Sequence, residues 1–430
     1  MKFQSIQEAI NKKSGKVAIR GWVYRERKSN QFIFLVIRDS SNIIQTVIKK
    51  DKVDKKIWDG ADKILIESSV ELEGTIKEDK RAPTGYEIEV SSLNIVHYAE
   101  PFPINKDQSV EFLADNRHLW LRSRKMISIM KIRSTVFGAI HEYFRDLGYY
   151  EFQSPIIIPG GAEEGPTLFE INYYKEKAYL CQTWQLYAES AIFALEKIYC
   201  IAPSFRAEKS NTSRHLTEYW HAEVEAPWIN LNELMDLGEG LIKHCFKRVL
   251  EKNKEELKLL GRDIKKLEPV VKKPFIRISY DDVLKDLSKK GMKIPWGKDL
   301  RTTEEEEFMK ENDVPAFVTN YPKDIMAFYK PRDPKNPKTA LCFDLIGPEK
   351  MGEIIGGSIR DENIEELKKS LKALGEDPEN YKYYLDTRKY GSVPHGGFGM
   401  GVERLVKWIC GLDNIKDAIA FPRTPARFKP

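Results

Sequence analysis

The sequence predicts a small all-β barrel at the N-terminus, followed by a larger α+β domain built on an antiparallel sheet. Two observations indicate this division. Residues 1–98 hold five short β-rich runs with turn residues between them. From residue 149 onward, strand and helix patterns mix without the regular βαβ alternation of a doubly wound sheet. In a chain of 430 residues we therefore expect a barrel domain at 1–98, a linker at 99–125 and a second domain at 126–430.

The first domain is expected to be an OB-fold. A turn at 39–42 joins its second and third strands, and the polar loop 77–85 separates the last two. Five short strands suit a small barrel, and the OB-fold is the common nucleic-acid-binding example. The predicted strands are residues 18–24, 31–38, 43–49, 69–76 and 86–96.

Two long helical patterns mark the second domain. The first covers residues 126–147 and ends at Gly148, a residue typical of helix C-termini. The second covers residues 231–260, and its charged residues are expected to form a solvated face.

Composition places the chain among soluble proteins of the cytoplasm. Hydrophobic residues make up 41% and charged residues 31%, and the formal net charge is +5, so a polyanionic partner must be met by local basic patches. The N-terminus lacks the apolar core of a signal peptide, and no apolar run is long enough to span a membrane. The five cysteines are scattered without metal-ligand spacing and are expected to be buried core residues.

The most informative segment is residues 200–228. Residues two apart in a strand share a face, so the even positions from 220 to 226 form an apolar face. The odd positions form a polar face made of Tyr219, His221, Glu223 and Glu225. We expect an antiparallel hairpin flooring a cleft, with Arg206 and Glu208 on the other strand and the basic loop 209–217 above. The alternative is a solvated surface hairpin with ordinary ion pairs.

Two glycine-rich segments follow. In residues 396–411, glycines let the backbone approach a ligand closely, and Arg404 stands in the first turn of a helix where a bound anion would offset its charge. In residues 344–360, Asp344 and Glu353 lie near a Gly-Gly-Ser turn and Arg360, and carboxylates beside a triphosphate need divalent cations between them. Strand parity puts Glu353 and Arg360 on opposite faces, so a bend at Gly356-Gly357 is expected if both serve one site.

These segments resemble class II aminoacyl-tRNA synthetases, and the resemblance covers nearly the whole chain. LGYYEFQSPII resembles their motif 1, whose proline (here Pro155) lies at the interface of a homodimer. FRAE with the later H-x-x-x-Y-x-x-x-E resembles motif 2, and GFGMGVERL resembles motif 3. Their order after an OB-like domain is similar to the aspartate, asparagine and lysine subclass.

The resemblance implies ATP and Mg²⁺ as substrate and cofactor. Arg206 would hold the α-phosphate as the amino acid's carboxylate attacks it, and Arg404 would hold the γ-phosphate. Glu208 would accept from the adenine amino group, Tyr219 would stack beneath the ring, and Asp344 and Glu353 would coordinate Mg²⁺. The other residues expected around ATP are Arg214, His215, Leu216, Glu353, Gly399 and Gly401.

The resemblance also implies an amino-acid site and a tRNA site. Glu163 and Gln185 would contact the substrate ammonium. Phe34 would stack on the central anticodon base and Gln45 would hydrogen-bond it, although Phe34 sits in an apolar run and could be core. The loop 77–85 would face the third anticodon base.

Asparagine is the amino acid that this pattern favours. Aspartyl members of the subclass carry a lysine at the position of Ala188, and a buried carboxylate substrate needs such a cation. Glu223 could accept from an amide NH₂ but would repel a carboxylate, while Arg360 could donate to the amide oxygen. The resemblance thus implies asparaginyl-adenylate formation, followed by transfer to tRNA(Asn).

Three other readings stay open at this point. The chain could be an aspartyl-tRNA synthetase, including one that charges both tRNA(Asp) and tRNA(Asn). It could be a tRNA-independent asparagine synthetase on the same catalytic domain, although residues 1–98 would then have no use. It could also be a nucleic-acid-binding module with an inactive catalytic domain, against which the complete set of charged motif residues argues.

Overall fold

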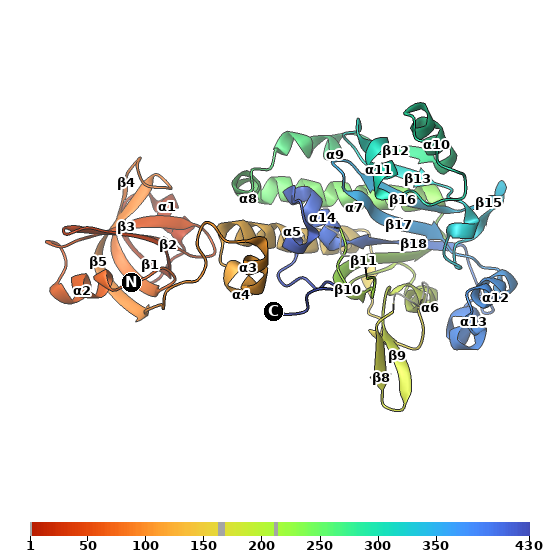
Figure 1. The fold of residues 1–430 in the computed structure, drawn as a ribbon, viewed down its shortest axis with the longest axis horizontal. Helices are drawn as coiled ribbons and strands as arrows, with labels where there is room; N and C mark the ends of the chain where they lie inside the picture. The colour runs from red at the N-terminus through yellow and green to blue at the C-terminus, as the bar shows by residue number, and fades with distance from the viewer. Residues whose placement is uncertain (1, 162–167, 210–213) are drawn as a thin grey trace. The chain divides into compact units, whose positions relative to one another are not determined.

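The computed structural model describes residues 2–161, 168–209 and 214–430. The chain forms two compact units, Met1–Ala114 and Asp115–Pro430 (Figure 1). In the described part of the chain, no helix has the length and apolar character needed to cross a lipid bilayer.

The first unit is a closed five-stranded barrel with the strand order β1-β2-β3-β5-β4. All neighbouring strands are antiparallel except β3 and β5, which pair in parallel. The predicted OB-fold and its five strands are confirmed. The strands are β1 (Gly15–Lys28), β2 (Phe32–Arg38), β3 (Ile43–Lys49), β4 (Ser69–Glu78) and β5 (Tyr86–His97).

Two helices in the barrel unit were not predicted, α1 (Ile6–Lys12) and α2 (Lys55–Asp62). Helix α1 begins with a capping box, in which the Ser5 side chain accepts from the Glu8 backbone N–H and the Glu8 carboxylate accepts from the Ser5 backbone N–H. The Ser-x-x-Glu spacing was therefore a readable signal for α1.

The second unit is built on an eight-stranded sheet with the order β12-β13-β16-β17-β18-β11-β10-β6. The central pairings are antiparallel, as predicted, but the outer pairs β12–β13 and β6–β10 are parallel, so the sheet is mixed. The strands are β6 (Tyr150–Glu151), β10 (Ile198–Phe205), β11 (Glu218–Pro227), β12 (Ile276–Ser279), β13 (Ala316–Thr319), β16 (Cys342–Gly347), β17 (Gly352–Ile359) and β18 (His395–Gly401).

Three helices cover one face of this sheet: α5 (Arg124–Asp146), α7 (Leu231–Lys252) and α14 (Val402–Cys410) (Figure 1). Their apolar stripes pack in one large core with the buried residues of β11, β16, β17 and β18. On the opposite face, α10 (Tyr280–Lys289) and α11 (Thr302–Met309) pack against apolar residues of β13 and β16, while β11, β17 and β18 present polar side chains to a cleft. Helix α5 confirms the first predicted helix.

The prediction of one helix over residues 231–260 is wrong. Helix α7 ends at Lys252, and α8 (Lys254–Leu259) begins after Asn253. Asn253 leaves the helical region at φ −122° and ψ 31°, and its side chain is buried. Asparagine competes with the backbone for hydrogen bonds and favours helix ends, which explains the break.

The remaining strands form two small sheets, and the remaining helices are short. Two small sheets are formed by β7 (Ile157–Ile158), β9 (Glu176–Leu180) and β8 (Glu170–Tyr173), and by β14 (Arg332–Asp333) and β15 (Asn336–Ala340). The other helices are α3 (Val110–Asp115), α4 (Arg117–Trp120), α6 (Gln185–Leu195), α9 (Glu268–Lys272), α10 (Tyr280–Lys289), α11 (Thr302–Met309), α12 (Ile364–Ala373) and α13 (Lys382–Asp386). Short 3-10 segments cover Ile264–Lys266, Lys323–Ile325, Pro378–Tyr381 and Ile415–Ala418.

Candidate active site

The predicted hairpin is present as β10 and β11, which pair antiparallel with Ser204 opposite Tyr219. Arg206 and Glu208, expected on its first strand, instead follow the end of β10 at Phe205. Its even face, including Ala222 and Val224, is buried in the large core. Its odd face looks onto two cavities on the other side of the sheet. The alternation in the sequence therefore located the floor of the site correctly.

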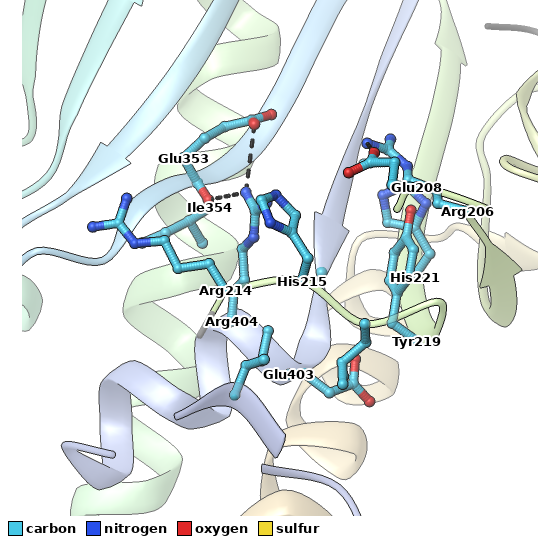
Figure 2. Close-up of a pocket in the computed structure, with 14 residues that line it drawn as sticks. Arg206, Glu208, Arg214, His215, Tyr219, His221, Glu353, Ile354, Glu403 and Arg404 are labelled. Carbon is cyan, nitrogen blue, oxygen red and sulfur yellow. Dashed lines mark hydrogen bonds and ion pairs between the residues drawn. The ribbon is translucent and has the colours of Figure 1, made fainter. Parts of the chain in front are cut away.

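The first cavity is lined by three arginines and three glutamates. Arg206, Arg214 and Arg404 all line it, and Figure 2 shows their side chains gathered around the same space. Every residue predicted to surround ATP lies in its lining: Arg206, Glu208, Arg214, His215, Leu216, Tyr219, Glu353, Gly399, Gly401 and Arg404. Three guanidinium groups around one cavity suit a polyanion such as a triphosphate.

Local contacts fix several of these side chains. The Arg404 guanidinium donates to the Glu353 carbonyl oxygen at 2.5 Å and lies 3.4 Å from its carboxylate. The Arg206 guanidinium lies 5.9 Å from the Tyr219 ring centroid. Burial, followed by the charge of Arg404, lowers the pKa of His215. The imidazole thus favours its neutral form, in which one ring nitrogen still donates a hydrogen bond.

The second cavity adjoins the first. Arg206, His221, Glu353 and Gly399 line both. Of the residues predicted to contact the amino acid, Gln185, Glu223 and Arg360 line this second cavity, together with Thr183 and Lys330. Glu163 lies outside the described residues.

One row of residues crosses the floor of the second cavity. Asp344 pairs with Gly356, Gly356 with Gly399, and Gly399 with Glu223, so the four lie side by side on adjacent strands. Adjacent strands are about 4.8 Å apart, which places the two carboxylate-bearing residues about 14 Å from each other. The floor therefore has glycine in the middle and a carboxylate at each end.

The glycines of β18 make room for neighbouring side chains. A Cβ on Gly399 would lie 2.4 Å from His221 Nε2, and one on Gly397 would lie 2.1 Å from Glu225 Oε2. Both distances are far inside van der Waals contact. Glycine is thus required at these two positions because side chains of β11 approach the β18 backbone closely, and not only because a ligand does.

A β-bulge, and not a bend at Gly356-Gly357, brings Glu353 and Arg360 to one site. Leu345 pairs with Ile355, but Ile346 pairs with Glu353, so Ile354 is an extra residue in β17. The extra residue reverses the side-chain alternation, and Glu353 joins Gly356 and Ser358 on the cleft face. A Cβ on Gly356 would lie 2.8 Å from Glu353 Oε1 and 3.6 Å from Asp344 Oδ1, so both carboxylates flank this glycine.

Asp344 and Glu353 form a half-buried acidic pair. Burial and the charge of Glu353 raise the pKa of Asp344 well above its usual value. The opposing pull of Arg404 outweighs burial and lowers the pKa of Glu353. Among residues 2–161, 168–209 and 214–430, no cluster of three or more His, Cys, Asp or Glu side chains has metal-binding geometry. Two carboxylates fit a Mg²⁺ ion that takes its other ligands from phosphate oxygens and water.

Two further acids act on this pair and were missed in the sequence. Asp299 and Glu305 contribute to the raised pKa of Asp344, and burial and Glu353 raise the pKa of Glu305 to about 7. Glu305 also lies 3.7 Å from Arg214. Both come from a segment without a recognisable motif, so the sequence carried no signal for them.

Glu223 is buried at the edge of the second cavity. Its carboxylate accepts from the Thr183 hydroxyl and, at 2.9 Å, from the Trp184 backbone N–H. Burial, only partly offset by these two bonds, raises the pKa of Glu223 to about 7. Ala188 is fully buried in an apolar cluster with Trp184 and Ile192.

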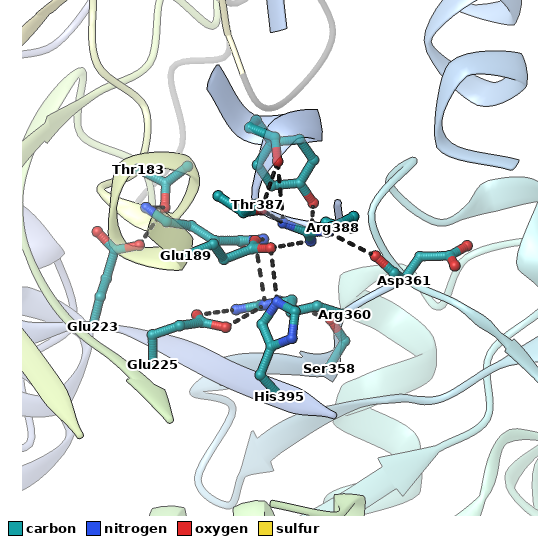
Figure 3. Close-up of polar contacts among 12 residues, drawn as sticks. Thr183, Glu189, Glu223, Glu225, Ser358, Arg360, Asp361, Thr387, Arg388 and His395 are labelled. Atoms are coloured by element: carbon teal, nitrogen blue, oxygen red, sulfur yellow. Dashed lines mark hydrogen bonds and ion pairs between the residues drawn. The ribbon is translucent and has the colours of Figure 1, made fainter. Parts of the chain in front are cut away.

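Arg360 is held by a second carboxylate. Its Nε and Nη2 groups donate to Glu225 at 2.9 and 2.8 Å, and Nη1 donates to Ser358 Oγ at 2.8 Å (Figure 3). These bonds use three of the five N–H groups of the guanidinium. Glu225, named in the sequence only as part of the polar face, is thus the residue that orients Arg360.

The predicted anticodon residues lie on β2 and β3 of the barrel. Phe34 is half-buried and lies outside the barrel's core cluster, because Ile33 and Leu35 point inward instead. Its ring centroid is 6.2 Å from that of Phe32. Gln45 donates to Glu87 at 2.7 Å, a contact that the sequence did not predict.

Pro155 is exposed, and so are the two isoleucines that follow it, at 43% and 44%. Three consecutive exposed apolar residues form a surface that a partner could cover.

Comparison with known protein families identifies the class of protein to which the chain belongs. The family model of class II tRNA synthetases (D, K and N) matches residues 109–425, and the model of the OB-fold nucleic acid binding domain matches residues 17–96. The chain is 50% identical to the asparagine–tRNA ligase of Thermoplasma acidophilum over 415 residues, with 96% of each chain covered. It is 43% identical to that of Lactobacillus johnsonii, with 99% of each covered.

Solved structures agree with these relatives. The asparaginyl-tRNA synthetase of Pyrococcus horikoshii complexed with asparaginyl-adenylate superposes with a TM-score of 0.96 at 44% identity, covering all of both chains. An aspartyl-tRNA synthetase from Entamoeba histolytica gives 0.87 at 27% identity, over 100% of this chain and 93% of that one. The chain belongs to the asparagine–tRNA ligases.

Proposed function

We propose that this chain activates asparagine with ATP and transfers it to tRNA(Asn). The observation that carries the proposal is the junction of the two cavities at Arg206, His221, Glu353 and Gly399. A nucleotide whose phosphates bind the three arginines of the first cavity and an amino acid in the second would meet there. The Pyrococcus horikoshii relative, 44% identical, is described with the asparaginyl-adenylate that such a reaction forms.

The proposed chemistry is an in-line displacement. A carboxylate oxygen of asparagine attacks the α-phosphorus, the bond to the β-phosphate oxygen breaks, and pyrophosphate leaves. Arg206, which lines both cavities, would bind the α-phosphate and stabilise the charge that develops on it. Arg404, anchored to Glu353, would hold the γ-phosphate at the far end. Positioning and charge stabilisation suffice, since no covalent nucleophile is needed.

The other nucleotide contacts follow from the lining. Glu208 would accept from the adenine amino group and Tyr219 would stack beneath the ring. Arg214 and His215 would lie over the triphosphate, and Leu216, Gly399 and Gly401 would complete the walls.

Asp344 and Glu353 would hold Mg²⁺. Such an ion neutralises phosphate charge and fixes the phosphate geometry. The raised pKa of Asp344 reflects burial and then a second carboxylate nearby, and a divalent cation would remove that repulsion.

Selection of asparagine would rest on Glu223 and Arg360. Glu223 would accept from the side-chain NH₂, and one of the N–H groups that Arg360 does not give to Glu225 or Ser358 would donate to the side-chain oxygen. Gln185, with Glu163, would contact the ammonium. Aspartate would place a carboxylate against Glu223 without a lysine at position 188 to balance it.

Binding of tRNA would use the barrel, with Phe34 stacking on the central anticodon base and Gln45 bonding to it. A homodimer would bury the exposed surface around Pro155.

A cytoplasmic location stays a prediction from composition. The aspartyl alternative is disfavoured because the relatives at 43% identity and above are asparagine–tRNA ligases. The tRNA-independent alternative is disfavoured by the barrel.

Charging of tRNA by the purified chain tests the proposal. With asparagine, ATP and Mg²⁺, tRNA(Asn) is expected to become charged, and Arg206→Lys is expected to lower the rate of adenylate formation at least 100-fold, an effect of about 3 kcal/mol. Arg20→Lys, an exposed change on the barrel, serves as the matched control with normal adenylate formation. Charging of tRNA(Asp), or full activity in Arg206→Lys, would contradict the proposal.

A further inference from the structure

A buried cluster behind the amino-acid cavity joins four separate segments of the chain. Its centre is Glu189 on α6, whose carboxylate binds Arg388 and His395 and lies 3.8 Å from Arg360 (Figure 3). The same carboxylate accepts a hydrogen bond from Gln185. The side chains of Glu189, Arg388 and His395 are completely buried. Glu189 does not line either cavity, so it acts on a substrate only through another residue.

Arg388 fixes the charge of this centre. Its guanidinium donates to Glu189 Oε2 and to the Tyr384 hydroxyl, and it stacks 4.1 Å from the Tyr384 ring centroid. The charges of Arg388 and His395 outweigh burial and lower the pKa of Glu189. Glu189 is therefore ionised and has acceptor oxygens only.

An acceptor-only neighbour determines which way the Gln185 amide points. Gln185 Nε2 lies 2.9 Å from Glu189 Oε1, and this contact is a hydrogen bond only when the NH₂ end faces the carboxylate. The opposite end of the amide, the carbonyl oxygen, is then the end turned toward the cavity that Gln185 lines. A carbonyl oxygen accepts from an ammonium group, whereas an NH₂ group would repel it.

We propose that Glu189 is a positioning residue that holds the Gln185 carbonyl toward the α-ammonium of the bound amino acid. The inference rests on the proposed function, because it takes the second cavity as the asparagine site. Glu189 would then help to select an α-amino acid without itself touching the substrate.

The substitution Glu189→Gln tests this with few atoms changed. A glutamine side chain has one oxygen, and Arg388, which only donates, will take it. The new NH₂ group then faces Gln185, whose amide must turn over and present its own NH₂ to the cavity. Loss of a hydrogen bond to a charged group corresponds to about a 10- to 100-fold rise in KM for asparagine.

A substrate analogue isolates the ammonium. Succinamate is asparagine without the α-amino group, so its inhibition constant in ATP–pyrophosphate exchange should be the same for the native protein and Glu189→Gln, within twofold. The double variant Gln185→Glu with Glu189→Gln transfers the carboxylate from position 189 to position 185, and its KM for asparagine should return most of the way to the native value. The introduced carboxylate would then accept from the introduced amide and offer its other oxygen to the ammonium.

Tyr384→Phe is the matched control. It removes a 2.8 Å bond to the same arginine without touching Gln185, and it should leave KM for asparagine unchanged even where the melting temperature falls. An unchanged KM in Glu189→Gln would overturn the proposal, and so would an equal weakening of succinamate. The proposed function fails separately, if the native protein shows no exchange with asparagine.

Discussion

Replacing Glu223 with glutamine is expected to raise stability above neutral pH while it weakens the choice of amino acid. Glu223 is 4% exposed, and burial raises the pKa of its carboxyl to about 7. The native protein therefore carries a buried negative charge at pH 8 that the unfolded chain would hold in water. Glutamine has nearly the same shape and no charge.

The magnitude follows from the two pKa values. The gap between 4.5 unfolded and about 7 folded corresponds to about 3 kcal/mol. Below pH 4.5 the carboxyl is protonated in both states and the penalty is absent. It grows as the pH rises from 4.5 to 7 and is complete above about 7. Glutamine has one acceptor oxygen for Thr183 and Trp184, which removes about 1 kcal/mol of the gain.

Chemical denaturation at pH 8 and pH 5 measures the difference. At pH 8 we expect Glu223→Gln to unfold with a free energy about 2 kcal/mol above that of the native protein, and at pH 5 the gain should vanish. Exchange assays should show that discrimination against aspartate falls at the same time. The exposed control Glu255→Gln should show no such pH dependence. A gain that is equal at both pH values, or no gain at pH 8, would refute the buried-charge account.

Three further predictions concern single positions. Gly397→Ala should raise KM for asparagine at least tenfold in exchange assays, because its Cβ would lie 2.1 Å from Glu225 Oε2; an unaltered KM would show that the strand can yield. Phe34→Ala should raise KM for tRNA about 5- to 150-fold in aminoacylation with normal exchange, the equivalent of about 1–3 kcal/mol of stacking, and normal tRNA binding would remove Phe34 from the anticodon site. Ala188→Lys should shift exchange from asparagine toward aspartate, and an unchanged preference would refute the role given to this position.

Local periodicity was enough to predict the barrel and the hairpin. Alternation of apolar and polar residues is a property of neighbouring positions, so Ala222 and Val224 in the cleft strand could be assigned to the core from the sequence. Residues 32–37 are all apolar, so the sequence left open whether Phe34 points into the barrel. Helix α1 was missed although the Ser5–Glu8 capping signal was present. The break at Asn253 was missed because a single asparagine inside an apolar period is a weak signal.

The motifs located the nucleotide cavity, but they did not reveal how its carboxylates are arranged. The bulge at Ile354 inserts one residue into a strand, and only the pairing with β16 reveals it. From the alternation of side chains alone, a bend at Gly356-Gly357 was the simplest way to bring Glu353 and Arg360 to one site.

The cluster around Glu189 behind the amino-acid cavity could not be predicted from the sequence for a similar reason. Glu189 and His395 meet across 206 positions of sequence. Contacts between residues so far apart leave no local pattern, and they follow only from the packing of α6 against β10, β11 and α13.

The account depends on a cavity that accepts a neutral amide and rejects a carboxylate. ATP–pyrophosphate exchange by the unmodified chain, measured with asparagine and with aspartate at pH 7.5, tests that claim most directly. We expect kcat/KM for asparagine to exceed that for aspartate by about a thousandfold or more, as for sites that discriminate through charge and hydrogen bonding. Equal values for the two amino acids would contradict the role of Glu223 and leave only the subclass assignment.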